Sequence, residues 1–303
     1  MLRPRILFVI ALLTLAGGCA RVPNTGVTLI KSANLTELKG YLLSHKADLD
    51  QFRSRGPFAV TVQTNHELRL SASEQFDTDL FLSASAGKAP LVIFLHGYAS
   101  TKEDHTYQAM HLASWGLHSV ALQLPNTGPW TDNGKTLARI VDSIYRSPEI
   151  VDNRVDVSRI ILVGHSFGGA SVAIALAEGA RAAGGILLDP AAVGRDLPGF
   201  LRQINKPVML LGADERVSVA RNRDYFYRFI RGDFAEVSIK DASHEDAQYP
   251  SRFAQTTEEL QITFVSALTA AAISLSFAGN FDYARASFND AFASGKLVDA
   301  RKK

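Results

Sequence analysis

A serine in a glycine-rich turn is the residue of this chain best placed to do chemistry. Ser166 lies at the centre of the pentapeptide 164–168, GHSFG, after the apolar run 160–163 and before the alanine-rich segment 170–177. Strand, sharp turn and helix form the context in which a G-x-S-x-G pattern exposes a serine hydroxyl above a sheet. The flanking glycines fit because side chains there would clash with the crossing strand and helix. Ser166 is therefore predicted to be a nucleophile.

A histidine must accompany such a serine. A serine hydroxyl is a poor nucleophile at neutral pH, so it needs an imidazole to take its proton and a carboxylate to orient that imidazole. In proteins with this turn, the acid and the histidine follow the serine along the chain. The chain has eight histidines, and His244 alone lies after Ser166. His244 follows the predicted strand 237–240, which makes it the predicted base.

Two aspartates are candidates for the acid. Asp189 directly follows the apolar run 186–188, and Asp214 follows the run 208–211. Both come just after predicted strands, where loops can aim side chains into a site. Their spacing from Ser166 leaves both candidates open.

An oxyanion hole is also required by this chemistry. The tetrahedral intermediate carries negative charge, and each fixed backbone N–H that binds it stabilises the transition state by about 3–4 kcal/mol. We predict that one donor is Phe167, directly after the nucleophile, and the other is Tyr98, in the loop after the strand 91–95. No metal or other cofactor is predicted, because the chain has no Cys/His cluster with zinc spacing and no P-loop.

Alternating strands and helices must position these residues. The predicted strands cover residues 58–62, 79–82, 91–95, 119–122, 160–163, 186–188, 208–211 and 237–240, and the predicted helices include 106–115, 135–145 and 170–177. Continuous apolar strands that alternate with helices indicate an α/β fold, in which helices cover both faces of a mostly parallel sheet.

The C-terminal part of the chain contains a long apolar segment. Residues 262–277 are nearly all apolar or small, but the run is short and contains several hydroxyl residues. We predict a buried amphipathic helix that packs on the sheet, begun by a capping box of Thr256 and Glu259. Residues 282–293 are predicted to form a last, surface helix.

Composition limits the partners. The chain is 47% hydrophobic with a net charge of +2 and has no block of Lys or Arg, so nothing in it indicates nucleic acid binding. The expected partner is a small-molecule substrate.

The first residues predict export. Arg3 and Arg5 precede the apolar run 6–16, which small residues and Cys19 follow. This order is typical of a secretory signal peptide. The run is much shorter than the roughly 20 residues of a membrane-spanning helix.

The only cysteine of the chain lies at the end of this signal. The segment 16–19 resembles the lipobox of bacterial lipoproteins, which implies cleavage before Cys19 and attachment of the protein to a membrane through a lipid on Cys19. Ala20 then implies sorting to the outer membrane of a Gram-negative bacterium. The alternative is an ordinary signal peptide with an incidental cysteine.

The expected organisation therefore has three parts. Residues 1–18 form the signal peptide, residues 19–56 a tether and helical lead-in, and residues 57–303 the catalytic domain.

A resemblance adds to these inferences. The chain resembles serine esterases of the α/β-hydrolase superfamily related to dienelactone hydrolase, most of all the platelet-activating-factor acetylhydrolase, plant chlorophyllase and bacterial polyester-hydrolase branches. The segments that carry it are 91–98, 111–116, 164–169 and 185–190, within about residues 57–250. The resemblance implies an α/β-hydrolase fold.

The resemblance also bears on the acid. The segment 185–190 resembles the one that carries the acid in the acetylhydrolase and chlorophyllase branches, which favours Asp189. In polyester hydrolases the acid follows the next strand, where a gapless match places Arg216 at the acid position.

Together the residues and the resemblance predict a carboxylic-ester hydrolase that forms an acyl-enzyme on Ser166, with a preference for short to medium acyl esters. The alternatives are an amidase, thioesterase or acyltransferase with the same triad, or a non-catalytic envelope lipoprotein that keeps the fold.

Overall fold

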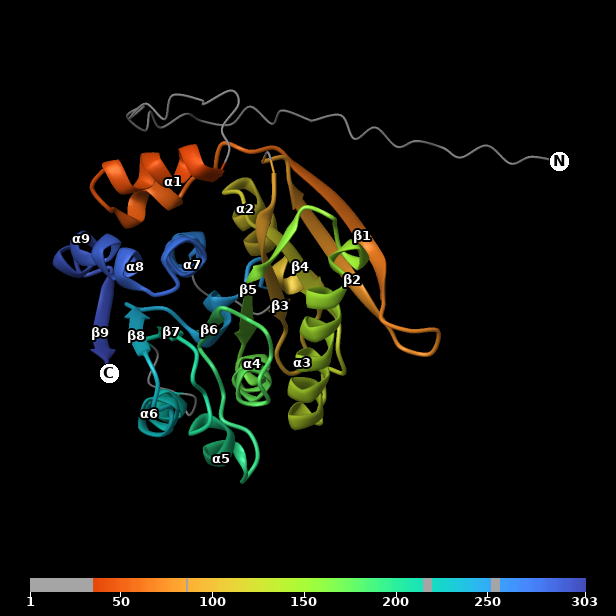
Figure 1. The fold of residues 1–303 in the computed structure, drawn as a ribbon. Helices are drawn as coiled ribbons and strands as arrows, with labels where there is room; N and C mark the ends of the chain where they lie inside the picture. The colour runs from red at the N-terminus through yellow and green to blue at the C-terminus, as the bar shows by residue number, and fades with distance from the viewer. Residues whose placement is uncertain (1–34, 86, 215–219, 252–256) are drawn as a thin grey trace. The chain divides into compact units, whose positions relative to one another are not determined.

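A nine-stranded sheet forms the centre of the part of the chain that the computed structural model describes, residues 35–85, 87–214, 220–251 and 257–303 (Figure 1). Its strand order is β1-β2-β4-β3-β5-β6-β7-β8-β9. The strands are β1 (Val60–Arg69), β2 (Gln75–Ser83), β3 (Ala89–Leu95), β4 (His118–Leu122), β5 (Val155–His165), β6 (Gly184–Leu188), β7 (Val208–Ala213), β8 (Phe234–Ile239) and β9 (Leu297–Lys302). The strands from β4 to β8 pair in parallel, whereas β1, β2 and β9 pair antiparallel at the two edges.

Helices cover both faces of this sheet (Figure 1). One face carries α1 (Leu35–Ser44), α2 (Thr106–Ser114), α7 (Glu258–Ala278), α8 (Asp282–Ser287) and α9 (Asn289–Ala293). The other carries α3 (Trp130–Arg146), α4 (Phe167–Ala177), α5 (Leu197–Leu201) and α6 (Ala220–Phe229). Short 3-10 helices are η1 (Leu49–Phe52), η2 (Lys102–His105), η3 (Pro148–Ile150) and η4 (His244–Ala247). The predicted mostly parallel sheet with helices on both faces is confirmed.

The strand β3 shows why a continuous apolar run fits this architecture. Successive side chains of a strand point to opposite faces, and here both faces are covered. Val92 and Phe94 lie in the core under α2 and α7, whereas Leu91 and Ile93 lie in the core under α3 and α4. All seven residues of β3 are buried.

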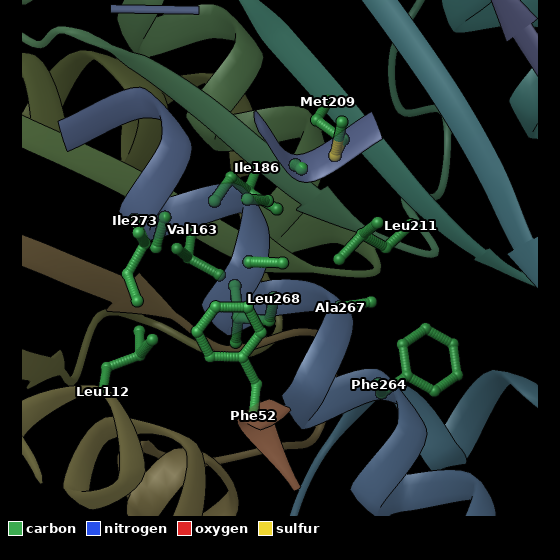
Figure 2. Close-up of a cluster of buried hydrophobic side chains, with 14 of the residues drawn as sticks. Phe52, Leu112, Val163, Ile186, Met209, Leu211, Phe264, Ala267, Leu268 and Ile273 are labelled. Carbon is green, nitrogen blue, oxygen red and sulfur yellow. The ribbon is translucent and has the colours of Figure 1, made fainter. Parts of the chain in front are cut away.

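The long apolar helix α7 lies within the core, as the sequence predicted. Figure 2 shows Phe264, Leu268 and Ile273 of this helix among side chains of the sheet and Phe52 of η1. By length and composition α7 could span a membrane, but most of its residues are buried inside the protein.

Two details of the α7 prediction differ. Polar residues such as Gln261 and Ser276 are buried along with the apolar ones, so the helix is enclosed on nearly all sides and has no wide polar face. Its N-cap is Thr257, without a side-chain cap hydrogen bond. Thr256, from the predicted capping box, lies outside the described residues.

The sheet extends further at both edges than the sequence indicated. The strands β1 and β2 form a long antiparallel hairpin, which reaches beyond the predicted segments 58–62 and 79–82. The segment 282–293, expected to be one helix, is divided into α8 and α9, and the fully buried Phe288 lies between them. β9, which was not predicted, then pairs with β8.

The segment before residue 57 packs on the same core as the sheet. Leu38 and Leu42 of α1 and Phe52 of η1 are almost completely buried there. The predicted signal peptide, Cys19 and the start of the tether lie outside the described residues.

Candidate active site

Five of the predicted site residues follow strands of the parallel part of the sheet. Tyr98 comes after β3, Ser166 after β5, Asp189 after β6, Asp214 after β7 and His244 after β8. These strands run in the same direction, so their carboxyl ends share one edge of the sheet. Ligands of open α/β sheets bind outside this edge.

Ser166 occupies a strained turn between β5 and α4. Its backbone has a φ of +54° and a ψ of −125°, a conformation that L-residues rarely adopt. The Ser166 N–H donates to the carbonyl oxygen of Leu188 at 3.1 Å, which ties the turn to the end of β6. This strained backbone conformation agrees with the sharp turn expected from the G-x-S-x-G pattern.

The glycines around this turn have no room for a side chain. A Cβ on Gly164 would lie 2.4 Å from the carbonyl oxygen of Gly168, and a Cβ on Gly168 would lie 2.5 Å from that of Leu95. Gly97, in the loop after β3, packs so closely that a Cβ would lie 2.9 Å from the Cβ of Ser166. The glycine requirement expected from the sequence is thus a requirement of close packing.

Asp189 and His244 form a short, buried hydrogen bond. His244 Nδ1 lies 2.5 Å from Asp189 Oδ2, and Asp189 Oδ1 accepts a hydrogen bond of 3.0 Å from the Ala213 N–H. Asp189 is 3% exposed. Because each carboxylate oxygen has its own donor, the carboxylate is held in one orientation toward the imidazole.

Asp214, the alternative acid, lies elsewhere at this edge. Its Oδ2 accepts a weak hydrogen bond of 3.4 Å from the Asp241 N–H, and its own N–H donates to the carbonyl oxygen of Ile239. Asp189 is therefore the aspartate whose carboxylate meets the His244 ring.

The side-chain rings of the two residues predicted to supply the oxyanion donors contact each other. Phe167 begins α4, so its N–H has no acceptor within the helix and lies at the positive end of the helix dipole. The ring of Tyr98, which is 59% exposed, contacts the edge of the Phe167 ring at a centroid distance of 6.5 Å. Trp130 stacks on Phe167 from another side at 5.3 Å. The backbone N–H groups of Tyr98 and Phe167 make no hydrogen bond within the described residues.

A polar network that the sequence did not indicate holds the loop after β3. His96 Nδ1 donates to the carbonyl oxygen of Gly97, and its Nε2 accepts from the Gln123 side chain at 2.9 Å and from the Leu124 N–H. Burial lowers the pKa of His96, against the opposing effect of the carbonyl oxygens of Gly97 and Leu124, each 3.0 Å from a ring nitrogen. The only signal in the sequence was the position of His96 directly before Gly97.

A buried lysine extends this network. Lys102 Nζ lies 2.9 Å from Asp79 Oδ1 and 3.0 Å from Asn65 Oδ1, and the Lys102 N–H donates to the Gln123 side chain. The side chains of Lys102 and Asp79 are both almost fully buried. The pair links the β1–β2 hairpin to the loop that carries Tyr98.

The sequence also did not predict the contact between His165 and His244. His165 Nε2 lies 3.0 Å from the carbonyl oxygen of His244, and the two rings lie 4.5 Å apart. His165 is part of the pentapeptide 164–168, but it occupies a variable position of the motif. Such a position does not indicate what its side chain contacts.

Comparison with known proteins places this geometry in a family. A family model described as the alpha/beta hydrolase family matches residues 92–290, which include all the predicted triad and oxyanion residues. A search of curated proteins found no match. The match covers most of the chain and agrees with the mostly parallel sheet and its helices. The chain therefore belongs to the alpha/beta hydrolase family.

Proposed function

We propose that this protein is a serine hydrolase that cleaves carboxylic esters of short to medium acyl chains. The observation that carries the proposal is the coincidence of Ser166 in its strained turn with the Asp189–His244 pair at one edge of the sheet. Family membership supports hydrolytic chemistry in general, and the triad narrows it to a serine mechanism.

The reaction follows from the roles of the three side chains. His244 Nδ1 keeps its hydrogen and donates a hydrogen bond to Asp189, so the other ring nitrogen, Nε2, takes the proton of Ser166 as Oγ attacks the ester carbonyl and the imidazolium that forms is stabilised by the carboxylate. The new Oγ–C bond forms as the carbonyl π electrons move onto oxygen. The N–H groups of Tyr98 and Phe167 then bind that oxyanion.

Collapse of the intermediate completes the first half. His244 returns its proton to the alcohol oxygen as the ester C–O bond breaks, and the acyl group stays on Ser166. A water molecule, activated by the same imidazole, then attacks the acyl carbonyl and releases the carboxylic acid.

The proposal includes a location. The sequence around Cys19 supports a lipid-anchored protein of the cell envelope, attached to the outer membrane of a Gram-negative bacterium.

A fluorophosphonate probe and a panel of aryl esters from acetate to palmitate test the enzymatic proposal. The wild-type protein is expected to bind one equivalent of probe and to hydrolyse the shorter esters fastest. Ser166→Ala is expected to abolish labelling and to lower kcat by about 10⁴–10⁶-fold. Ser158→Ala, a change at an exposed serine of the same strand, is the matched control and is expected to retain both activities.

Labelling of Ser166→Ala at the wild-type level would exclude Ser166 as the nucleophile. Activity that rises continuously through palmitate, with activation at lipid interfaces, would contradict the assigned acyl range.

A further inference from the structure

The imidazole of His165 connects the strand that carries the nucleophile to the loop that carries the base. His165 is the last residue of β5, directly before Ser166, and is 2% exposed. Its Nε2 is 3.0 Å from the backbone carbonyl oxygen of His244. Its ring also lies against the His244 ring, with centroids 4.5 Å apart and planes inclined by 38°. One buried side chain therefore contacts both the backbone and the ring of His244.

The chemistry of these contacts defines one form of His165. A carbonyl oxygen only accepts, so Nε2 must carry the hydrogen. Burial lowers the pKa of His165 well below its ordinary value, and the neighbouring His244, His105 and His96 lower that pKa further. These imidazoles reach it from η4, from η2 and from the end of β3. At neutral pH His165 is consequently an uncharged ring with its hydrogen on Nε2.

The bond to Asp189 alone does not fix the plane of the His244 ring. A hydrogen bond at Nδ1 fixes that nitrogen, whereas the tilt of the ring about the line from Nδ1 to Asp189 Oδ2 also depends on what packs around the imidazole, and a tilt about that line moves Nε2. A ring packed against one face of the imidazole blocks that motion. The bond from His165 to the carbonyl oxygen holds the backbone from which the ring projects.

We propose that His165 is a positioning residue that fixes the plane and the height of the His244 imidazole relative to Ser166. The inference rests on the proposed function only in taking His244 as the base. Simple core packing does not require a histidine here, because an apolar side chain would fill the same space without burying a polar ring. His165 Nδ1 has no partner within the described residues and lies against Gly97, so the ring is buried with one nitrogen unsatisfied.

Two substitutions in the full-length protein separate the two contacts. His165→Gln retains an amide N–H at the position of Nε2 but loses the ring. His165→Phe retains a ring but loses the donor. We expect His165→Phe to lower kcat by about 100-fold with KM changed less than about threefold, because a misplaced catalytic group affects the transition state and not substrate binding. The kcat of His165→Gln is expected to be at least about tenfold higher than that of His165→Phe.

A matched control measures the general effect of replacing a buried histidine. His118 is fully buried at the opposite end of the parallel strands, where β4 begins. His118→Gln is expected to leave kcat within about threefold of wild type. If His165→Phe behaves like this control, or if the Gln variant is no better than the Phe variant, the positioning role is wrong.

Nuclear magnetic resonance tests the geometry without turnover, first in the wild-type protein and then in the two variants. In the wild-type protein at pH 7, the ¹⁵N spectrum is expected to show His165 as the neutral tautomer with its hydrogen on Nε2. A charged ring, or a hydrogen on Nδ1, would overturn the proposal. In both variants we also expect the strongly downfield proton between His244 Nδ1 and Asp189 to broaden, more in the Phe variant. A wild-type protein without esterase activity would refute the proposed function, whereas these spectra would still decide the role of His165.

Discussion

At the scale of single residues, Asp189 has two separate tasks. Its Oδ1 accepts the Ala213 N–H, and its Oδ2 meets His244 Nδ1. Both oxygens act as acceptors, so an amide in their place would satisfy one donor and oppose the other. The site of Asp189 therefore requires a carboxylate and does not suit the neutral amide of asparagine. The more exposed site of Asp214 has no such requirement.

Parallel kinetics on two asparagine variants test this difference. We expect Asp189→Asn to lower kcat by roughly 10⁴-fold, because the amide favours the wrong tautomer of His244. Asp214→Asn should stay within about tenfold of wild type, a barrier change under about 1.4 kcal/mol. Both folded variants are measured on the same short-chain ester. The reverse pattern would assign the acid to Asp214.

The sequence indicated these residues unequally. Ser166 and His244 were identified from a motif and from chain order, and the structure brings the His244 ring to Asp189. Their catalytic roles stay predictions. The contact of His165 with His244 and the link from Lys102 to Gln123 could not be predicted, because they join segments far apart in the chain and depend on side-chain direction.

At the scale of elements, the buried parallel strands were the predictable part. A strand covered on both faces needs apolar residues throughout, so β3 and the buried second half of β5 were evident, whereas the partly exposed first half of β5 was not. β1 is exposed along most of its length and carries polar residues, so no alternation marked its extent. β9 is rich in charged residues, and its Arg301 pairs with the buried Glu236 of β8. Such an ion pair depends on the tertiary fold, so the sequence of β9 alone did not indicate it.

The helix α1 offers a direct test of what belongs to the folded domain. Leu38 is 2% exposed and contacts the core shared with α7, whereas Leu43 on the same helix is 61% exposed. We expect Leu38→Ala to lower the free energy of unfolding by about 2–5 kcal/mol, because it leaves a cavity. Leu43→Ala should change it by less than about 0.5 kcal/mol. Urea unfolding monitored by circular dichroism provides both values, and equal effects would mean that α1 does not belong to the core.

At the scale of the whole molecule, buried neutral histidines make stability depend on pH. Burial is the main cause that lowers the pKa values of His105, His111 and His118 to about 4. In the unfolded chain each titrates near 6.5, so between about pH 6.5 and 4 the unfolded state binds more protons than the folded state. Above about pH 6.5 these histidines therefore do not reduce the free energy of unfolding. They reduce it progressively as the pH falls toward 4.

Each of these histidines is expected to lower the free energy of unfolding by about 3 kcal/mol at pH 4 relative to pH 7. Urea unfolding at pH 7, 5.5 and 4.5 measures the decline. His118→Gln should reduce the slope of stability against pH by about one proton in this interval. A slope identical to that of wild type would show that folding does not lower the pKa of His118.

In the proposed lipid-anchored form, attachment of the whole molecule to a membrane depends on one residue. We expect Cys19→Ala to abolish incorporation of a palmitate analogue in a Gram-negative host and to leave the protein uncleaved or mislocalised. The esterase activity of the folded domain should persist, because Cys19 lies far along the chain from the catalytic residues. Equal labelling of wild type and variant would rule out lipidation at Cys19.

The apolar helix α7 has a consequence for secretion. Under the proposed export, this segment passes through the translocation channel unfolded, before any sheet exists to cover it. Its 21 residues are long and apolar enough to leave the channel sideways and remain in the lipid. Thr263, Ser266 and Thr269 make that escape less favourable, and after folding their hydroxyls donate to carbonyl oxygens of their own helix. Under that proposed export, translocation of the unfolded chain would constrain the composition of α7 in addition to the folded core.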